Sequence, residues 1–108
     1  MSIEDKDKID SIGVNKDTAM VTLAITDHLN WENEYEHLIM LQEKINLYLS
    51  FLESGEIYES YPIAKGKNIE IKIYAKYDLT EKAEEFLNFA YAKVVEAGFN
   101  LSCEILGE

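Results

Sequence analysis

The chain has 108 residues, 21 of them Asp or Glu and 10 Lys or Arg, so its formal net charge is −11. This charge disfavours binding to nucleic acids or to anionic membranes, and the sequence has no apolar run of about 18 residues to span a bilayer. A hydrophobic fraction of 47% predicts a folded protein, with one domain over residues 1–108.

The N-terminal end of the chain is polar. Residues 1–8 carry many charges and no periodicity, so we expect a frayed lead-in rather than a signal peptide. Cys103 is the single cysteine and cannot form an internal disulfide. These features predict a cytoplasmic protein.

Two extended runs follow, at residues 9–14 and 19–26. The four residues between them, Asn15 to Thr18, are typical of a hairpin turn. In the second run Val21, Leu23 and Ile25 fall on one face, which predicts a strand with one side in the core.

A long helix is predicted next, capped by Asn30, running to about Ser54 and ended by Gly55. At about 100° per residue, one side of this helix is apolar and should face the core. That side carries Trp31, Leu38, Leu41, Ile45, Tyr48, Leu49 and Leu52. A second apolar cluster, Met40, Leu47 and Phe51, lies on another sector and either packs against the second helix or forms a homodimer seam.

The second half of the chain predicts a connection over residues 56–67, a strand over 68–77, a helix capped by Thr80 and stopped by Gly98, and a last strand over 99–106. The core face of this helix carries Ala83, Phe86, Leu87, Ala90, Val94 and Ala97. The order β-β-α-β-α-β, with strands apolar on one face, predicts an α+β two-layer sandwich. A four-stranded mixed sheet would have both helices on one face.

No motif in the chain identifies a chemistry. Glu34 and His37 have the i, i+3 spacing of a metal-ligand pair, but one pair is too few ligands for a metal site. We therefore interpret His37 as a boundary residue beside a solvated glutamate, and Cys103 as a core residue. Asp27 is expected to end its strand and accept hydrogen bonds from the following turn. We predict no catalytic residues, no metal and no cofactor.

The stretch from Thr26 to Glu32, with Glu36-His37-Leu38, Leu41 to Asn46, Tyr48-Leu49 and Glu53 to Tyr58, resembles an uncharacterised family of short acidic bacterial proteins. The likeness spans residues 8–105 and is strongest over 27–62. It implies a bacterial cytosolic protein and brings no catalytic or binding residues.

An aromatic and acidic set brackets the long helix at both ends, and such residues are typical of binding surfaces for a basic partner. The set is Trp31, Glu32, Tyr35, Glu36, Tyr58, Glu59 and Tyr61. The alternative is that Trp31 and Tyr35 belong to the core while the other tyrosines pin the connecting loop.

Three functions remain as hypotheses. The leading one is a noncatalytic module that binds a basic protein, with an immunity-type inhibitor of a basic toxin as one version. The second is a small enzyme or ligand-binding domain that uses Asp27, His28 and His37. The third is a homodimeric structural accessory protein.

Overall fold

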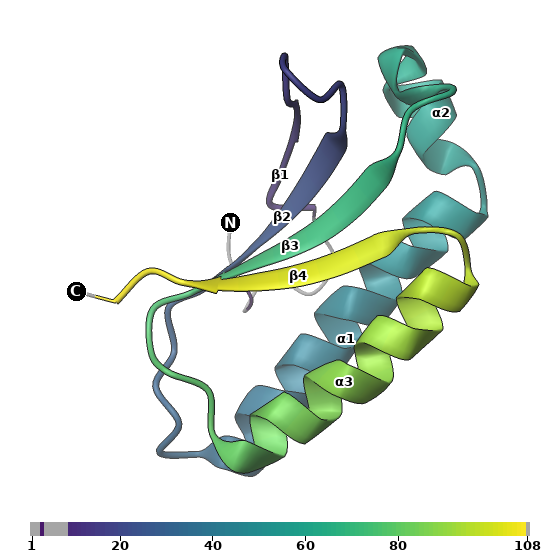
Figure 1. Cartoon of the computed structure of the whole chain (residues 1–108). Helices are drawn as coiled ribbons and strands as arrows, with labels where there is room; N and C mark the ends of the chain where they lie inside the picture. Colours follow the sequence, from purple (N-terminus) through teal and green to yellow (C-terminus); the bar gives the residue numbers. More distant parts are fainter. Residues whose placement is uncertain (1–2, 4–8, 108) are drawn as a thin grey trace.

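The computed structural model describes residue 3 and residues 9–107, and it shows one sheet covered by helices (Figure 1). The elements in chain order are β1 (Ser11–Val14), β2 (Val21–Asp27), α1 (Glu34–Glu53), α2 (Glu56–Ser60), the short 3-10 helix η1 (Pro62–Ala64), β3 (Ile69–Ala75), α3 (Glu81–Glu96) and β4 (Asn100–Ile105). In the described part of the chain, none of the helices is both long and apolar enough to cross a bilayer.

The four strands form one mixed sheet in the order β1-β2-β3-β4. β1 runs antiparallel to β2, whereas the β2–β3 and β3–β4 pairs are parallel. Each parallel pair is joined by a long helix, as a parallel connection requires. The predicted fold class, an α+β sandwich with a four-stranded mixed sheet, is confirmed.

The two central strands carry the alternation that places the core on one face of the sheet. Val21, Leu23 and Ile25 of β2 are fully buried, and Ile71 and Ile73 of β3 lie beside the last two of them in register. The residues between them are more accessible, because successive side chains point to opposite faces of a strand. The core therefore lies on the helical side only.

Helices α1 and α3 cover the same face of the sheet and run side by side (Figure 1). Each follows a strand of the parallel set, so both helices begin at the same end of the molecule. This arrangement puts the first turns of α1 and α3 close to the carboxyl ends of β2 and β3. Because both first turns carry glutamates, this end of the molecule is negatively charged.

Helix α3 matches its prediction closely. The Thr80 hydroxyl accepts a hydrogen bond from the backbone N–H of Ala83 at 3.1 Å, which caps the helix. Four residues of the predicted face are buried, and Phe86 and Ala97 are half-buried. The buried four are Ala83, Leu87, Ala90 and Val94.

Helix α1 begins later than predicted, at Glu34, with Asn33 in the capping position and no side-chain cap bond. Asn30 is not the cap. Its side chain accepts a hydrogen bond from the Glu32 backbone N–H at 3.1 Å, and its carbonyl accepts one from the His37 ring. Trp31 consequently lies in the turn before the helix and not on its core face. Gly55 ends α1 in the left-handed conformation, as expected.

The connection after α1 is more ordered than the sequence suggested. Its first part forms α2 and its second part forms η1, which bury Ile57 and Ala64 respectively. These two side chains extend the core beyond the end of α1. Apolar residues at these positions therefore hold the connection against the core.

The predicted frayed lead-in is wrong for one residue. Ile3 is 1% exposed, and its backbone N–H donates to the Thr26 carbonyl at 2.9 Å. The other residues of the stretch 1–8 lie outside the described part of the chain. Ile3 is thus part of the core, which explains an isolated apolar residue among charged neighbours.

Candidate functional site

Five polar residues are buried where α1 packs against β2 and the segment before β1. We call them the polar seam: Asp10, Asp27, His37, Lys44 and Tyr48. The three helical members are spaced seven and four residues apart, so they share one face of α1. That face carries charge into a core that is otherwise apolar, which makes the seam the first candidate for chemistry.

Asp27 and His37 form the first half of the seam. His37 Nε2 lies 2.6 Å and 2.8 Å from the two carboxylate oxygens of Asp27, and both side chains are almost fully buried. The Asp27 carboxylate also accepts the Leu29 backbone N–H at 3.2 Å, as predicted for a residue that ends a strand before a turn. Trp31 stacks on the imidazole with 3.6 Å between ring centroids.

Both ring nitrogens of His37 have a partner within the protein. Nδ1 lies 2.9 Å from the Asn30 carbonyl oxygen, and Nε2 faces the Asp27 carboxylate. The ring is therefore held between the turn before α1 and the end of β2, which is the arrangement expected of a structural histidine.

The second half of the seam joins Asp10, Lys44 and Tyr48. Lys44 Nζ lies 2.8 Å from Asp10 Oδ1, and Lys44 is 0% exposed. The other Asp10 oxygen accepts the Thr26 backbone N–H at 3.0 Å. The Tyr48 hydroxyl accepts from the Asp10 backbone N–H at 2.7 Å and donates to the Ala24 carbonyl at 2.6 Å. This cluster ties α1 to the edge of the sheet.

Burial changes the acidity of two groups near the core. Desolvation raises the pKa of the Tyr48 hydroxyl above its ordinary value of 10.0; the hydrogen bond from the Asp10 backbone N–H opposes this shift, and the nearby Asp10 charge adds to it. Desolvation likewise raises the pKa of the Cys103 thiol, with a smaller contribution from the Asp27 carboxylate. A thiol with a raised pKa holds less thiolate at neutral pH, so Cys103 is a poor nucleophile.

The structure corrects the predicted environment of His37 and shows that His28 lies apart from it. His37 is not a boundary residue beside solvated Glu34, because its ring is 2% exposed and pairs with Asp27. The imidazole that Asp27 contacts is that of His37, and His28 is exposed. Cys103 is half-buried and packs against the core. Among the described residues, no group of three or more His, Cys, Asp or Glu could hold a metal ion.

The polar seam was missed by sequence reasoning, although a signal for it exists. Asp27 continues the alternation of Val21, Leu23 and Ile25, which places its carboxylate on the core face of β2. A buried carboxylate needs a partner, and His37 and Lys44 lie at a spacing of seven on the helix that covers β2. Together, those two observations would have predicted the contact between Asp27 and His37.

The aromatic and acidic set lies at the two ends of α1, a distance of about 30 Å for a helix of this length. At the first end Tyr35 is 75% exposed, whereas Trp31 is half-buried on His37. At the second end Tyr58 is half-buried and Tyr61 is exposed. Glu32, Glu36 and Glu59 are exposed. The set therefore forms two separate surfaces, one at each end of the helix.

The apolar cluster of Met40, Leu47 and Phe51 is half-buried and packs against the core. At 100° per residue this cluster lies on the opposite flank of α1 from Gln42 and Leu49, which face α3. The cluster consequently does not pack against the second helix. Its part in a homodimer seam stays a prediction.

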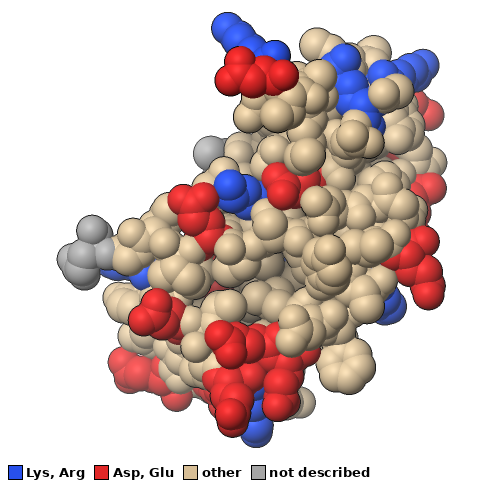
Figure 2. Space-filling view, in the orientation of Figure 1, with Lys and Arg blue, Asp and Glu red and all other residues tan. Residues whose placement is uncertain are grey.

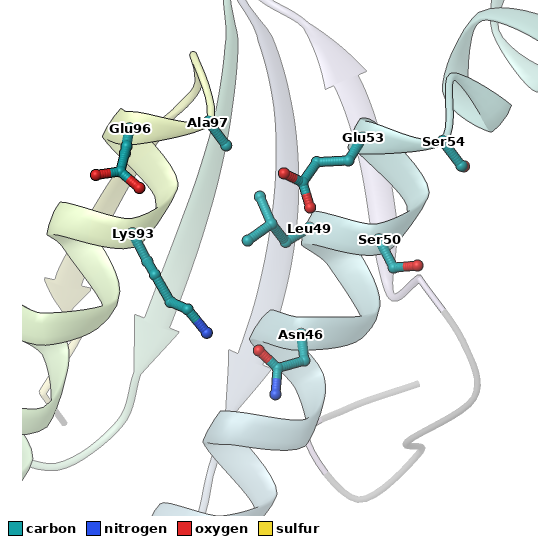
Figure 3. A pocket seen from close by; sticks show the side chains of 8 residues that line it. All are labelled: Asn46, Leu49, Ser50, Glu53, Ser54, Lys93, Glu96 and Ala97. Atoms are coloured by element: carbon teal, nitrogen blue, oxygen red, sulfur yellow. The ribbon is translucent and has the colours of Figure 1, made fainter.

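A groove runs between α1 and α3 on the outside of the helical layer. Two adjoining hollows of about 470 and 650 Å³ share Asn46, Leu49 and Lys93, so they form one continuous depression. We call it the α1–α3 groove. Its apolar floor is Ile45, Leu49, Phe86, Ala90 and Val94. Figure 3 shows Leu49 and Glu53 of α1 and Lys93 of α3 pointing into the space between the helices.

Phe89 lines this groove and is 81% exposed, more than any other large apolar side chain in the described residues. A phenyl ring left in water forfeits roughly 1.5–3 kcal/mol of burial free energy. The sequence carried a signal for it, because Phe89 falls outside the core face predicted for α3. A large aromatic residue off the core face is a candidate contact with a partner.

Carboxylates surround the end of the molecule where both helices begin. Figure 2 shows most of the acidic side chains of this face gathered at the end where α3 starts, with a basic side chain among them, and more basic side chains toward the opposite end. The first turns of the two helices hold Glu34, Glu36, Glu81 and Glu84, where the helix dipole favours negative charge. The parallel arrangement of α1 and α3 thus concentrates negative potential at one end.

Comparison with known proteins places the chain in an uncharacterised group. The model of a family described as "Family of unknown function (DUF6572)" matches residues 1–107. The expected resemblance to an uncharacterised family is confirmed. No curated protein and no solved structure was found to match the chain.

Proposed function

The chain belongs to the family of unknown function DUF6572, and on that premise we propose that it is a noncatalytic module that binds a basic protein. The binding surface is the outer face of α1 and α3, along the groove that runs from the middle of the two helices to the end at which they finish. The observation that carries the proposal is Phe89, 81% exposed beside an apolar groove on a strongly acidic protein. Exposed aromatic anchors among carboxylates supply both contact area and electrostatic steering.

The chemistry of the polar seam favours binding over catalysis. The enzyme hypothesis required Asp27, His28 and His37 to act together at a pocket. A hollow of about 220 Å³ does include His37 in its lining, but both ring nitrogens of His37 are bonded to Asp27 and Asn30. Asp27 and His28 do not line that hollow, so the three residues do not converge on it, and the proposal assigns it no reaction.

The proposal is tested with the natural partner. The tagged protein would be used to capture ligands from its own host, and any captured protein would be purified and bound at about 50 mM and 500 mM salt. A partner with a basic surface whose affinity falls steeply with salt supports the proposal. Failure to capture any protein, or binding that is indifferent to salt, would contradict it.

An immunity-type inhibitor of a basic toxin is one form of such a module. A toxin reading frame beside the gene for this chain would support that form, and co-expression of the two proteins would then restore growth. Loss of that protection in Tyr35→Ser or Phe89→Ser would place the contact on the outer helical face.

A further inference from the structure

We infer that the α1–α3 groove binds one amphipathic helix of the basic partner, with its apolar side on the groove floor and Lys or Arg residues toward the rim. This inference rests on the proposed function and names the element that the surface recognises. The chemistry is that of a helix-in-groove interface, in which apolar residues at i, i+3, i+4 and i+7 act as anchors.

The shape of the groove suits a helix. Two neighbouring helices that run side by side leave a valley into which the side-chain ridges of a third helix fit. Along α1 the lining residues extend from Gln42 to Ser54, which corresponds to about 18 Å. That length accepts roughly three turns of helix, enough for two or three apolar anchors.

The floor and rim of the groove differ in chemistry. The floor is made of core residues, of which Val94 is fully buried while Ile45, Leu49 and Ala90 are at most 9% exposed. Phe89 stands at the rim and would close over an apolar side chain placed on that floor. An interface built this way buries the phenyl ring that is otherwise left in water.

Charge decides between the candidate occupants. Glu53 and Glu96 line one end of the groove, Glu85 lies beside Phe89 near the other end, and Lys93 lies between them. A helix with basic residues at its ends and an acidic or neutral residue opposite Lys93 complements this pattern. A second copy of the chain does not, because each copy carries a net charge of −11 and would bring like-charged rims together.

The test uses defined peptides and three variants. A peptide of about 16 residues, with leucines at helical spacing, lysines toward both ends and neutral polar residues between them, is titrated into the isotopically labelled protein and followed by NMR. A scrambled peptide of the same composition and a peptide with glutamates in place of lysines serve as probes of pattern and charge. We expect the patterned basic peptide alone to shift the resonances of groove residues.

The variants separate the groove from the rest of the surface. Phe89→Ser and Asn46→Arg change exposed groove residues and should each weaken binding about tenfold. Tyr91→Ser is the matched control, since Tyr91 is also exposed on α3 but lines a different hollow next to β4. Its affinity should stay within about twofold of the original protein.

The outcomes distinguish this inference from the proposed function. No binding of the patterned peptide, equal binding of the scrambled peptide, or equal losses in Phe89→Ser and Tyr91→Ser would overturn the groove as a helix site. If a natural basic partner is captured but protects only the open face of the sheet from hydrogen exchange, the inference is wrong while the proposed function stands. If no natural basic partner exists, the proposed function itself fails.

Discussion

At the scale of single residues, Asp27 shows how one carboxylate can organise a junction. It ends β2, accepts a backbone N–H from the following turn, and holds the imidazole ring of His37 on the next helix. Such a buried pair contributes little net stability compared with apolar residues, because both side chains lose their hydration. Removing one member is costly, because the other polar side chain is then left buried without this partner.

Asp27→Asn is therefore expected to lower the free energy of unfolding by about 3–5 kcal/mol, measured by urea denaturation at neutral pH. The matched control is Glu34→Gln, which neutralises the carboxylate one turn before His37. This control should cost less than about 1 kcal/mol, since Glu34 is not the partner of His37. Equal losses in the two variants would show that the buried pair is not the main contact of the histidine.

Tyr48 makes a second prediction at this scale, on pH dependence. Its pKa is raised in the folded state by burial, so above pH 10 the unfolded chain loses the tyrosine proton while the folded chain keeps it. The unfolding free energy should then fall by up to about 1.4 kcal/mol per pH unit above pH 10. Below about pH 10 both states keep the proton, so the tyrosine causes no loss of stability there.

Tyr48→Phe should remove this part of the alkaline loss, although it is less stable at neutral pH because the bonds to Asp10 and Ala24 disappear. The difference in unfolding free energy between the two proteins would be measured from about pH 9 to pH 11, a range that brackets the ordinary tyrosine pKa. A difference that stays constant over this range would contradict a raised pKa for Tyr48.

At the scale of elements, the two long helices begin in different ways. α3 is capped by its own Thr80 hydroxyl, whereas α1 starts at Asn33 with no side-chain cap bond. The start of α1 is instead held by tertiary contacts of its first turn, in which the His37 ring bonds the Asn30 carbonyl and stacks on Trp31. The two helix ends should respond differently to the same kind of substitution.

Thr80→Ala is expected to destabilise the protein by about 1 kcal/mol, because the Ala83 backbone N–H loses its acceptor. Asn33→Ala should cost about 0.5 kcal/mol or less, since its side chain makes no cap bond and donates to Glu36 at an exposed site. Both values would come from thermal or urea unfolding. A larger loss in Asn33→Ala would mean that its side chain caps α1 in solution.

At the scale of the whole molecule, charge and topology act together. The net charge of −11 is a property of composition, but its concentration at one end follows from the parallel course of α1 and α3. Two first turns rich in glutamate lie together only because both helices follow strands of the same parallel set. The way the helices connect the strands therefore places negative charge at one end of the molecule.

Added salt should stabilise the fold, because it screens the repulsion among the carboxylates at this end. Raising NaCl from about 20 to 500 mM shortens the Debye length several-fold, and the urea midpoint is expected to rise. The double variant Glu84→Gln/Glu85→Gln should show a smaller rise, because it carries less charge at the crowded end. A midpoint that falls with added salt would indicate that exposed ion pairs, such as Lys72 with Glu104 at 3.1 Å, outweigh the repulsion.

Particular residues show how far the chain could be interpreted from its sequence. Val21, Leu23, Ile25 and the face of α3 were predicted correctly, because a period of two or 3.6 residues reports burial directly. His37 was not, because its position on the helix is compatible with several partners. Its true partner lies ten residues earlier on another element, and only the packing of α1 on β2 brings the two together.

The sequence by itself determined the class of fold, the positions of the strands and long helices, and the excess of negative charge, since these depend on local periodicity and composition. The tertiary structure alone decided the strand order, the polar seam, the separation of the aromatic residues into two surfaces, and the groove beside Phe89. These features depend on which segments meet in space. Contacts between distant segments follow from the packing of the whole chain and leave little trace in any single stretch of it.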